Sequence, residues 1–154
     1  MKVLFVCLGN ICRSPTAEGV FRRALERAGM SNQVEVDSCG VGNWHVGKAP
    51  DQRAQQAAKL RGIDLSGLRA RQLSERDFTD FDYVLGMDQD NLRAMRELKP
   101  ANSSAHTGLF LDFAGTPGVE VPDPYYGGEE GFENVLNMIE AASNGLIQHL
   151  QRER

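Results

Sequence analysis

The chain has 154 residues and a formal net charge of −4, and this length suits one domain (residues 1–154) with its own hydrophobic core. The mild acidity argues against a nucleic-acid-binding protein, and no apolar run approaches the length of a membrane span. The cysteines are Cys7, Cys12 and Cys39, an odd number with no secretory leader before them. They favour a reducing, cytoplasmic location over a disulfide-bonded framework.

The first thirty residues predict a strand, a loop and a helix. Residues 3–7 form a continuous apolar run that is too short for a helix, which is typical of a strand buried on both faces. Apolar residues then recur at helical spacing after Ser14, which suits a helix N-cap, and Pro15 suits the first helical position. Gly29 is expected to end this helix.

The rest of the chain continues the alternation of strands and helices. Further strands are predicted at residues 34–38, 81–87 and 106–111, and helices at 50–62, 74–80, 88–100 and 135–150. This order predicts an α/β fold with a four-stranded parallel sheet and helices on both faces. Ligands of such sheets bind at the carboxyl ends of the strands, where Cys7 and Ser38 lie.

The segment Cys-Leu-Gly-Asn-Ile-Cys-Arg-Ser, here called loop 7–14, joins the first strand to the first helix. Gly9 and Asn10 can take positive φ angles, so that backbone N–H groups point inward beside the helix N-terminus and bind an anion. Arg13 can bond two phosphoryl oxygens at once. The segment lacks the Gly-Lys-Ser/Thr ending of an ATP-binding loop, and we expect no cofactor.

Cys7 is the candidate nucleophile of this loop. The amide donors, the helix N-terminus and Arg13 favour its thiolate over its thiol, and Ser14 can hydrogen-bond the sulfur when it later leaves. A Cys-x5-Arg spacing also arises by chance, as a buried cysteine at a strand end and a surface arginine. The placement between a strand and a helix favours the catalytic interpretation.

Residues 7–15, CLGNICRSP, resemble the signature of the low-molecular-weight protein tyrosine phosphatases. The resemblance implies that family's four-stranded parallel sheet, a two-step hydrolysis of phosphotyrosine in proteins through phosphocysteine, and a monomer or weak dimer. It extends over essentially the whole chain, through Asp37-Ser38, residues 44–50 (WHVGKAP), 70–72 (ARQ), 81–88 and 123–127 (DPYYG).

The resemblance assigns the general acid to Asp123, which lies between Pro122 and Pro124. Taken alone, an aspartate in a proline-rich loop is more often a turn former. In the family, the aspartate at this place protonates the leaving oxygen and then activates water against the phosphocysteine.

Apolar and aromatic side chains are expected around the mouth of the site. Trp44 and the pair Tyr125 and Tyr126 are candidates for two walls, although tyrosines at such positions also serve ordinary packing. A relative that prefers phosphoarginine carries Thr where this chain has Ile11, so Ile11 favours an aryl phosphate. The predicted substrate-binding residues are Leu8, Gly9, Asn10, Ile11, Cys12, Ser14, Trp44, Tyr125 and Tyr126.

Asn10 and Ser38 are expected to support the loop through hydrogen bonds. Many family members have a His where this chain has Leu68, so this supporting network is expected to differ here. Cys12 has two open interpretations. It either forms a disulfide with an oxidised Cys7 or packs beneath the loop as a buried thiol.

Other polar side chains are expected to be solvated, and no metal site is predicted, because the histidines lack metal-ligand spacing. An arsenate reductase on the same scaffold is a weaker alternative, since no cysteine follows Cys39 to resolve the reaction, and a glutaredoxin-coupled version, which needs fewer cysteines, stays open. A non-catalytic phosphate-binding module is also weaker, since Cys7, Arg13 and Asp123 are all present. The side chains expected to be solvated are His45, His106, His149, Arg69, Arg71 and Arg76, with a capping role open for the histidines and a substrate-docking role open for the arginines.

Overall fold

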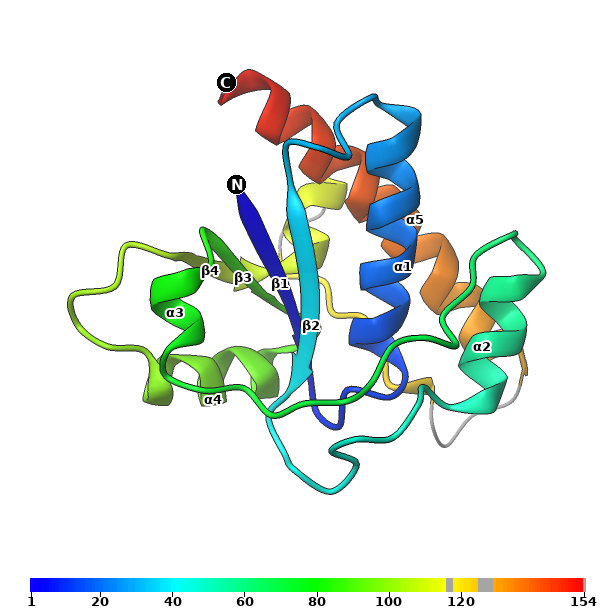
Figure 1. Ribbon diagram of the computed structural model, residues 1–154, viewed down its shortest axis with the longest axis horizontal. Coiled ribbons are helices and arrows are strands. Elements are labelled where there is room, and N and C mark those ends of the chain that lie inside the picture. Colours follow the sequence, from blue (N-terminus) through cyan, green and yellow to red (C-terminus); the bar gives the residue numbers. More distant parts are fainter. Residues whose placement is uncertain (116–117, 125–128, 154) are drawn as a thin grey trace.

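The computed structural model describes residues 1–115, 118–124 and 129–153. Four strands form one parallel sheet in the order β2-β1-β3-β4 (Figure 1), which confirms the predicted fold class. The strands are β1 (Lys2–Cys7), β2 (Glu35–Gly40), β3 (Tyr83–Gly86) and β4 (His106–Leu109). The helices are α1 (Arg13–Arg27), α2 (Gln52–Lys59), α3 (Asp77–Asp80), α4 (Gln89–Leu98), α5 (Glu129–Arg152) and the 3-10 helix η1 (Phe110–Ala114).

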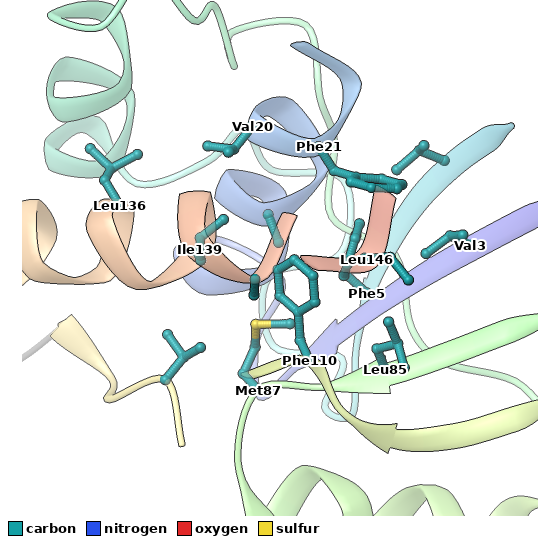
Figure 2. Packing of buried hydrophobic residues seen from close by; sticks show 14 of the residues in the cluster. Val3, Phe5, Val20, Phe21, Leu85, Met87, Phe110, Leu136, Ile139 and Leu146 are labelled. Atoms are coloured by element: carbon teal, nitrogen blue, oxygen red, sulfur yellow. The ribbon is translucent and has the colours of Figure 1, made fainter. Parts of the chain in front are cut away.

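The core lies in two layers, one on each face of the sheet. Val3 and Phe5 pack into the larger layer with α1 and α5, and Leu4 and Val6 pack into the smaller layer with α3 and α4. Figure 2 shows the larger layer around Phe5, whose ring centroid lies 4.6 Å from that of Phe110. Because successive β1 side chains enter opposite layers, the strand is apolar throughout residues 3–7, as the sequence indicated.

Four helix starts differ from the predicted ones: α3 begins at Asp77 instead of residue 74, α5 begins at Glu129 instead of residue 135, and the first two helices also start elsewhere. The first helix begins at Arg13 with Cys12 in the N-cap position, because the Ser14 hydroxyl turns toward Cys7 instead of capping the helix. The second begins at Gln52, where the Asp51 carboxylate accepts hydrogen bonds from the backbone N–H groups of residues 53 and 54. That carboxylate, and not Pro50, therefore starts α2.

The fourth strand ends earlier than predicted, at Leu109, and the chain turns into η1. The close packing of η1 on α5 explains why Gly145 lies inside a helix. A Cβ at this position would lie well inside contact distance of the Phe113 carbonyl oxygen. Among the described residues, no helix has the length and apolar character needed to cross a bilayer.

The loops that follow β1 and β2 lie side by side at the carboxyl edge of the sheet (Figure 1). The backbone N–H of Val41 donates to the Cys7 carbonyl at 2.9 Å. A Cβ on Gly40 would lie 2.9 Å from the carbonyl carbon of Gly9, so only glycine allows this approach of the two backbones. The end of β2 thus forms one wall against which loop 7–14 folds.

Candidate active site

Cys7, the last residue of β1, is buried at the base of loop 7–14. Its Sγ lies 3.0 Å from the Ser14 hydroxyl oxygen and accepts the backbone N–H of Asn10 at 3.3 Å. The loop therefore curls back so that residues three and seven positions later contact the sulfur. The sulfur lies among hydrogen-bonding groups beside the N-terminus of α1.

The turn of the loop depends on Asn10, which has a φ angle of 59°. The expectation that Gly9 also takes a positive φ is wrong, because Gly9 is not among the residues with that conformation. Glycine is needed at position 9 for another reason, because a Cβ there would lie 2.9 Å from the His45 ring. Asparagine tolerates the left-handed region better than most residues.

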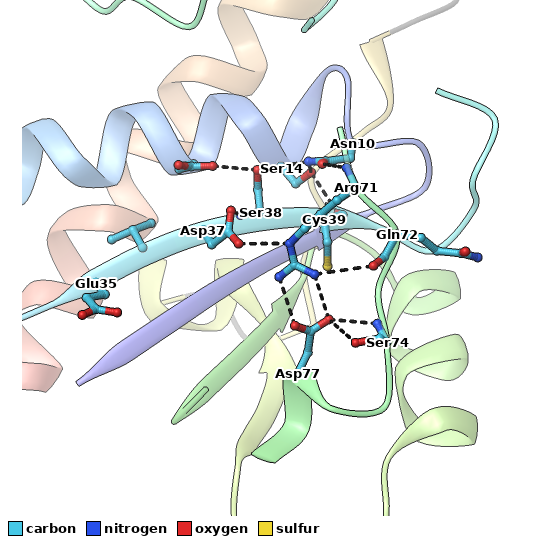
Figure 3. A network of polar contacts seen from close by, with 12 residues as sticks. Asn10, Ser14, Glu35, Asp37, Ser38, Cys39, Arg71, Gln72, Ser74 and Asp77 are labelled. Carbon is cyan, nitrogen blue, oxygen red and sulfur yellow. Dashed lines mark hydrogen bonds and ion pairs between the residues drawn. The ribbon is translucent and has the colours of Figure 1, made fainter. Parts of the chain in front are cut away.

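The Asn10 side chain connects the loop to β2 and to the segment before α3 (Figure 3). Its Nδ2 donates to the Ser14 hydroxyl at 2.8 Å and to the Ser38 hydroxyl at 3.0 Å, and its Oδ1 accepts the Arg71 backbone N–H at 3.0 Å. Ser38 in turn donates to Glu18 Oε1 at 2.8 Å. These partners fix the amide orientation, so the Ser14 proton is left for the Cys7 sulfur or for the Cys39 carbonyl oxygen, which lies 3.3 Å from the hydroxyl.

Glu18 is a buried carboxylate that the sequence analysis missed. Burial raises its pKa, and the hydrogen bonds from Ser38 and Arg22 only partly oppose this. Its position one turn before Arg22, on the buried face of α1, is the signal that could have found it. Leu68 takes no part in this network and packs, partly buried, against the core.

Arg71 was expected to be solvated, but its side chain is only 34% exposed and is held by two carboxylates. Its guanidinium bonds Asp37 at 3.0 Å and both carboxylate oxygens of Asp77 at 3.0 and 3.1 Å. Burial works against the charged form, but the hydrogen bond with Asp77 and the nearby acidic groups outweigh it and raise the pKa of Arg71. These ion pairs hold the backbone N–H of residue 71 where Asn10 needs it (Figure 3).

Arg13, the first residue of α1, is only 3% exposed. Its Nη1 donates to Asp88 Oδ2 at 2.6 Å and to the Val121 carbonyl at 3.0 Å. Burial disfavours the charged form, but the negative charges of Cys7, Asp88 and Asp123 outweigh burial and raise the pKa of Arg13. Residue 88 was predicted only as the start of a helix, and its contact with Arg13 was not expected.

Asp123 reaches the site because its loop is fixed at the end of β3. The backbone N–H of Val121 donates to the Met87 carbonyl at 2.8 Å, and the Val121 side chain is fully buried. Two residues later, the Asp123 carboxylate lies 3.6 Å from Arg13 Nη2 and is 35% exposed. The acid predicted from the distant Asp-Pro motif thus lies beside the predicted phosphate-binding arginine.

These side chains open on one pocket of about 300 Å³. The predicted Trp44 lines it and is 63% exposed. His45 also lines it, although solvation was expected, and Tyr125 and Tyr126 lie outside the described residues. The lining consists of Cys7, Leu8, Gly9, Ile11, Cys12, Arg13, Trp44, His45 and Asp123, and the buried Asn10 and Ser14 are not part of it.

Comparison with known proteins decides the family. Residues 2–154 match the family model described as low molecular weight phosphotyrosine protein phosphatase. The chain belongs to this family. It is 48% identical to a relative with that name from Schizosaccharomyces pombe, and the match covers 95% of each chain. It is also 39% identical to YfkJ, a low molecular weight protein-tyrosine-phosphatase from Bacillus subtilis, over 100% of this chain and 98% of the relative.

A solved structure shares the fold closely. The protein tyrosine phosphatase of Entamoeba histolytica, crystallised with Hepes in its active site, superposes with a TM-score of 0.95. The two chains are 38% identical, and the match covers 99% of this chain and 98% of the other. The resemblance found in the sequence is therefore confirmed by the fold and by the whole-chain match.

Two further features complete the description of this family member. Cys12 lines the pocket but is buried, and burial raises the pKa of its thiol, with smaller contributions from nearby acidic groups.

Away from the pocket, His106 and His149 gather around Tyr83, whose hydroxyl lies 3.0 Å from His149 Nε2. Within the described ranges, no group of three or more His, Cys, Asp or Glu side chains could hold a metal ion.

Proposed function

We propose that this protein hydrolyses phosphotyrosine in proteins through a phosphocysteine formed on Cys7. One observation carries the proposal. The Cys7 sulfur, the Arg13 guanidinium and the Asp123 carboxylate open on the same pocket, and the Ser14 hydroxyl lies 3.0 Å behind the sulfur. Family membership supports the same reaction, since the relatives carry the name of phosphotyrosine phosphatases.

In the first step, the Cys7 thiolate attacks phosphorus and the bond from phosphorus to the aryl oxygen breaks. Arg13 binds two of the phosphoryl oxygens, held from behind by Asp88 at 2.6 Å. Asp123, in its acid form, gives its proton to the departing aryl oxygen. The products of this step are a tyrosine hydroxyl, a phosphocysteine and an Asp123 carboxylate.

In the second step, water attacks the phosphocysteine and the sulfur–phosphorus bond breaks. The Asp123 carboxylate takes one proton from the water, which restores the acid and yields inorganic phosphate. The sulfur leaves as a thiolate, and the hydroxyl of Ser14 donates to it. The hydrogen bond from Asn10 to Ser14, at 2.8 Å, orients that hydroxyl for this purpose.

The rim of the pocket supports an aryl substrate. Leu8 and Trp44 are exposed large apolar side chains beside the sulfur, and Ile11 packs partly buried next to them in the same lining. An aromatic ring carried by the phosphate would contact these apolar surfaces, whereas a short serine side chain would not reach them. Phosphoarginine remains an outcome that the substrate assay distinguishes.

Neither alternative from the sequence analysis is favoured. The matching family and its relatives are phosphatases, and an arsenate reductase that resolves its reaction within the chain would need a further cysteine after Cys39. We also propose a cytoplasmic location, supported by three thiols that are all free. The monomer or weak dimer stays a prediction that sedimentation in solution can check.

The deciding experiment measures kcat/KM for matched peptides carrying phosphotyrosine, phosphoserine or phosphoarginine, with a chelator present. Phosphotyrosine should be hydrolysed best, and rapid acid quenching should trap phosphate on Cys7. Cys7→Ser should abolish turnover, whereas Cys39→Ala, a matched control at another buried cysteine, should retain it. Turnover by Cys7→Ser, or a preference for one of the other two peptides, would contradict the proposal.

A further inference from the structure

We propose a second anion site, separate from the pocket at Cys7, that binds the phosphate group of a small phosphorylated molecule or of free phosphate. It lies between α1, α5 and the residues after α2, in a cavity of about 300 Å³. It shares no lining residue with the catalytic pocket. The residues that carry the inference are Arg23, Arg27, Arg61, Glu140, Ser143 and Asn144, all in its lining.

The charge of this cavity is opposite to that of the chain. Three arginines and one glutamate line it, which gives a formal charge of +2, whereas the whole chain carries −4. Arg61 is held in place by two carboxylates of α5, Glu133 at 2.7 Å and Glu140 at 3.2 Å. The two carboxylates more than compensate its charge, so the three arginines together with Glu133 and Glu140 carry a formal charge of +1, and Arg61 forms a fixed wall of the cavity.

Arg23 and Arg27 supply the charge that is not compensated. They lie one turn apart on α1, and in the described part of the chain neither has a carboxylate partner. Arg23 instead donates to the backbone carbonyl of Arg61, which directs it across the cavity. Two like charges at this spacing destabilise a helix, and a bound anion would remove that cost.

Ser143 is an independent indication of a ligand. Its side chain is 1% exposed and lines the cavity, yet within the described ranges its hydroxyl has no hydrogen-bond partner. A serine inside a helix commonly bonds the carbonyl one turn earlier, and a buried hydroxyl without any partner is rare in folded proteins. Because its oxygen has almost no accessible surface, the Ser143 side chain would rotate toward the cavity to donate to an acceptor oxygen there, beside the amide of Asn144.

A phosphate group suits these donors best. It has three acceptor oxygens, enough for the two guanidinium groups and the hydroxyl together, whereas a carboxylate has two. The cavity is as large as the catalytic pocket, which leaves room for an organic part of the ligand. From Arg13 to Arg23, α1 rises by about 15 Å, so the two sites are well separated.

Backbone amide NMR titrations with inorganic phosphate and with propylphosphonate, at constant ionic strength, test the proposal. Two groups of resonances should respond, one in loop 7–14 and one around Arg27 and Ser143, with separate dissociation constants. Tighter binding of propylphosphonate to the second group indicates a phosphorylated organic ligand, and tighter binding of phosphate indicates the free ion. If the resonances of the second group alone did not respond, this site would be refuted and the proposed phosphatase activity would stand.

Variants make the assignment specific. Arg27→Gln and Ser143→Ala should each raise the dissociation constant of the second group about tenfold and leave the first group unchanged. Arg93→Gln, which alters an exposed arginine on α4, should change neither. Unchanged binding in both Arg27→Gln and Ser143→Ala, or an equal response to chloride, would overturn the proposal.

Discussion

Replacing Asn10 tests whether its side chain holds the catalytic loop in shape. Asn10→Gly removes three buried hydrogen bonds, to Ser14, Ser38 and the backbone of Arg71, but allows the φ angle of 59°. Asn10→Ala removes the same bonds and also puts a β-carbon into the left-handed region. The pair therefore separates the hydrogen-bond contribution from the backbone contribution.

The structure sets the size of each effect. Net hydrogen-bond contributions of about 1 kcal/mol each give a loss of about 3 kcal/mol in the free energy of unfolding for Asn10→Gly. The left-handed backbone adds about 1 kcal/mol for Asn10→Ala. Both variants should also lower kcat by about tenfold or more, because the Ser14 hydroxyl loses the donor that orients it toward Cys7.

Urea unfolding and steady-state hydrolysis of an aryl phosphate measure these two quantities. Asn102→Ala, at an exposed asparagine outside the site, is the control and should leave both unchanged. Wild-type stability and kcat in Asn10→Gly would show that the hydrogen bonds do not support the loop. Equal stability of the alanine and glycine variants would refute the conformational part of the reasoning.

Four other changes have distinct expected outcomes. Gly145→Ala should lower the free energy of unfolding by about 1–3 kcal/mol, despite better helix propensity, because the new methyl meets the η1 backbone; higher stability in urea would contradict this. Burial raises the pKa of Glu18 above 4.5, so its stabilising contribution at low pH is lost as pH rises through the folded-state pKa. In Glu18→Gln, the free energy of unfolding should therefore decline less as the pH rises. If unfolding experiments gave the same slope of that free energy against pH as in the wild type, the prediction would be wrong. Asp123→Asn should lower kcat about 100-fold for substrates with poor leaving groups and less for good ones; equal losses would remove Asp123 from the first step. After peroxide treatment, a dithiol should restore the parent and hardly restore Cys12→Ser, whereas equal recovery would show that Cys12 only packs.

The sheet and the catalytic loop could be predicted because their signals are local. A continuous apolar run is typical of a central parallel strand, and β1 is buried on both faces. The break at Gly9 and Asn10, followed by Arg13, indicates a turn into a helix N-terminus. Which of the two loop residues takes the positive φ could not be predicted, because contact with His45 makes glycine necessary at position 9.

The supporting residues could not be predicted because their roles depend on distant contacts. Arg71 looks like any surface arginine until the fold places it against Asp37 and Asp77. Glu18 looks like half of a helix-surface ion pair until β2 covers it with Ser38. Such roles become visible only when strands and loops from separate parts of the chain meet.

The two oxygens of Asp88 restrict evolution and design at this position. Oδ1 accepts the backbone N–H of Asn91 at 2.8 Å and starts α4, whereas Oδ2 holds Arg13 at 2.6 Å. Asparagine, serine and threonine would also start a helix, but none has a second anionic oxygen for the guanidinium. A library selected only for folding would therefore accept several residues at position 88, and one selected for phosphate binding should keep aspartate alone.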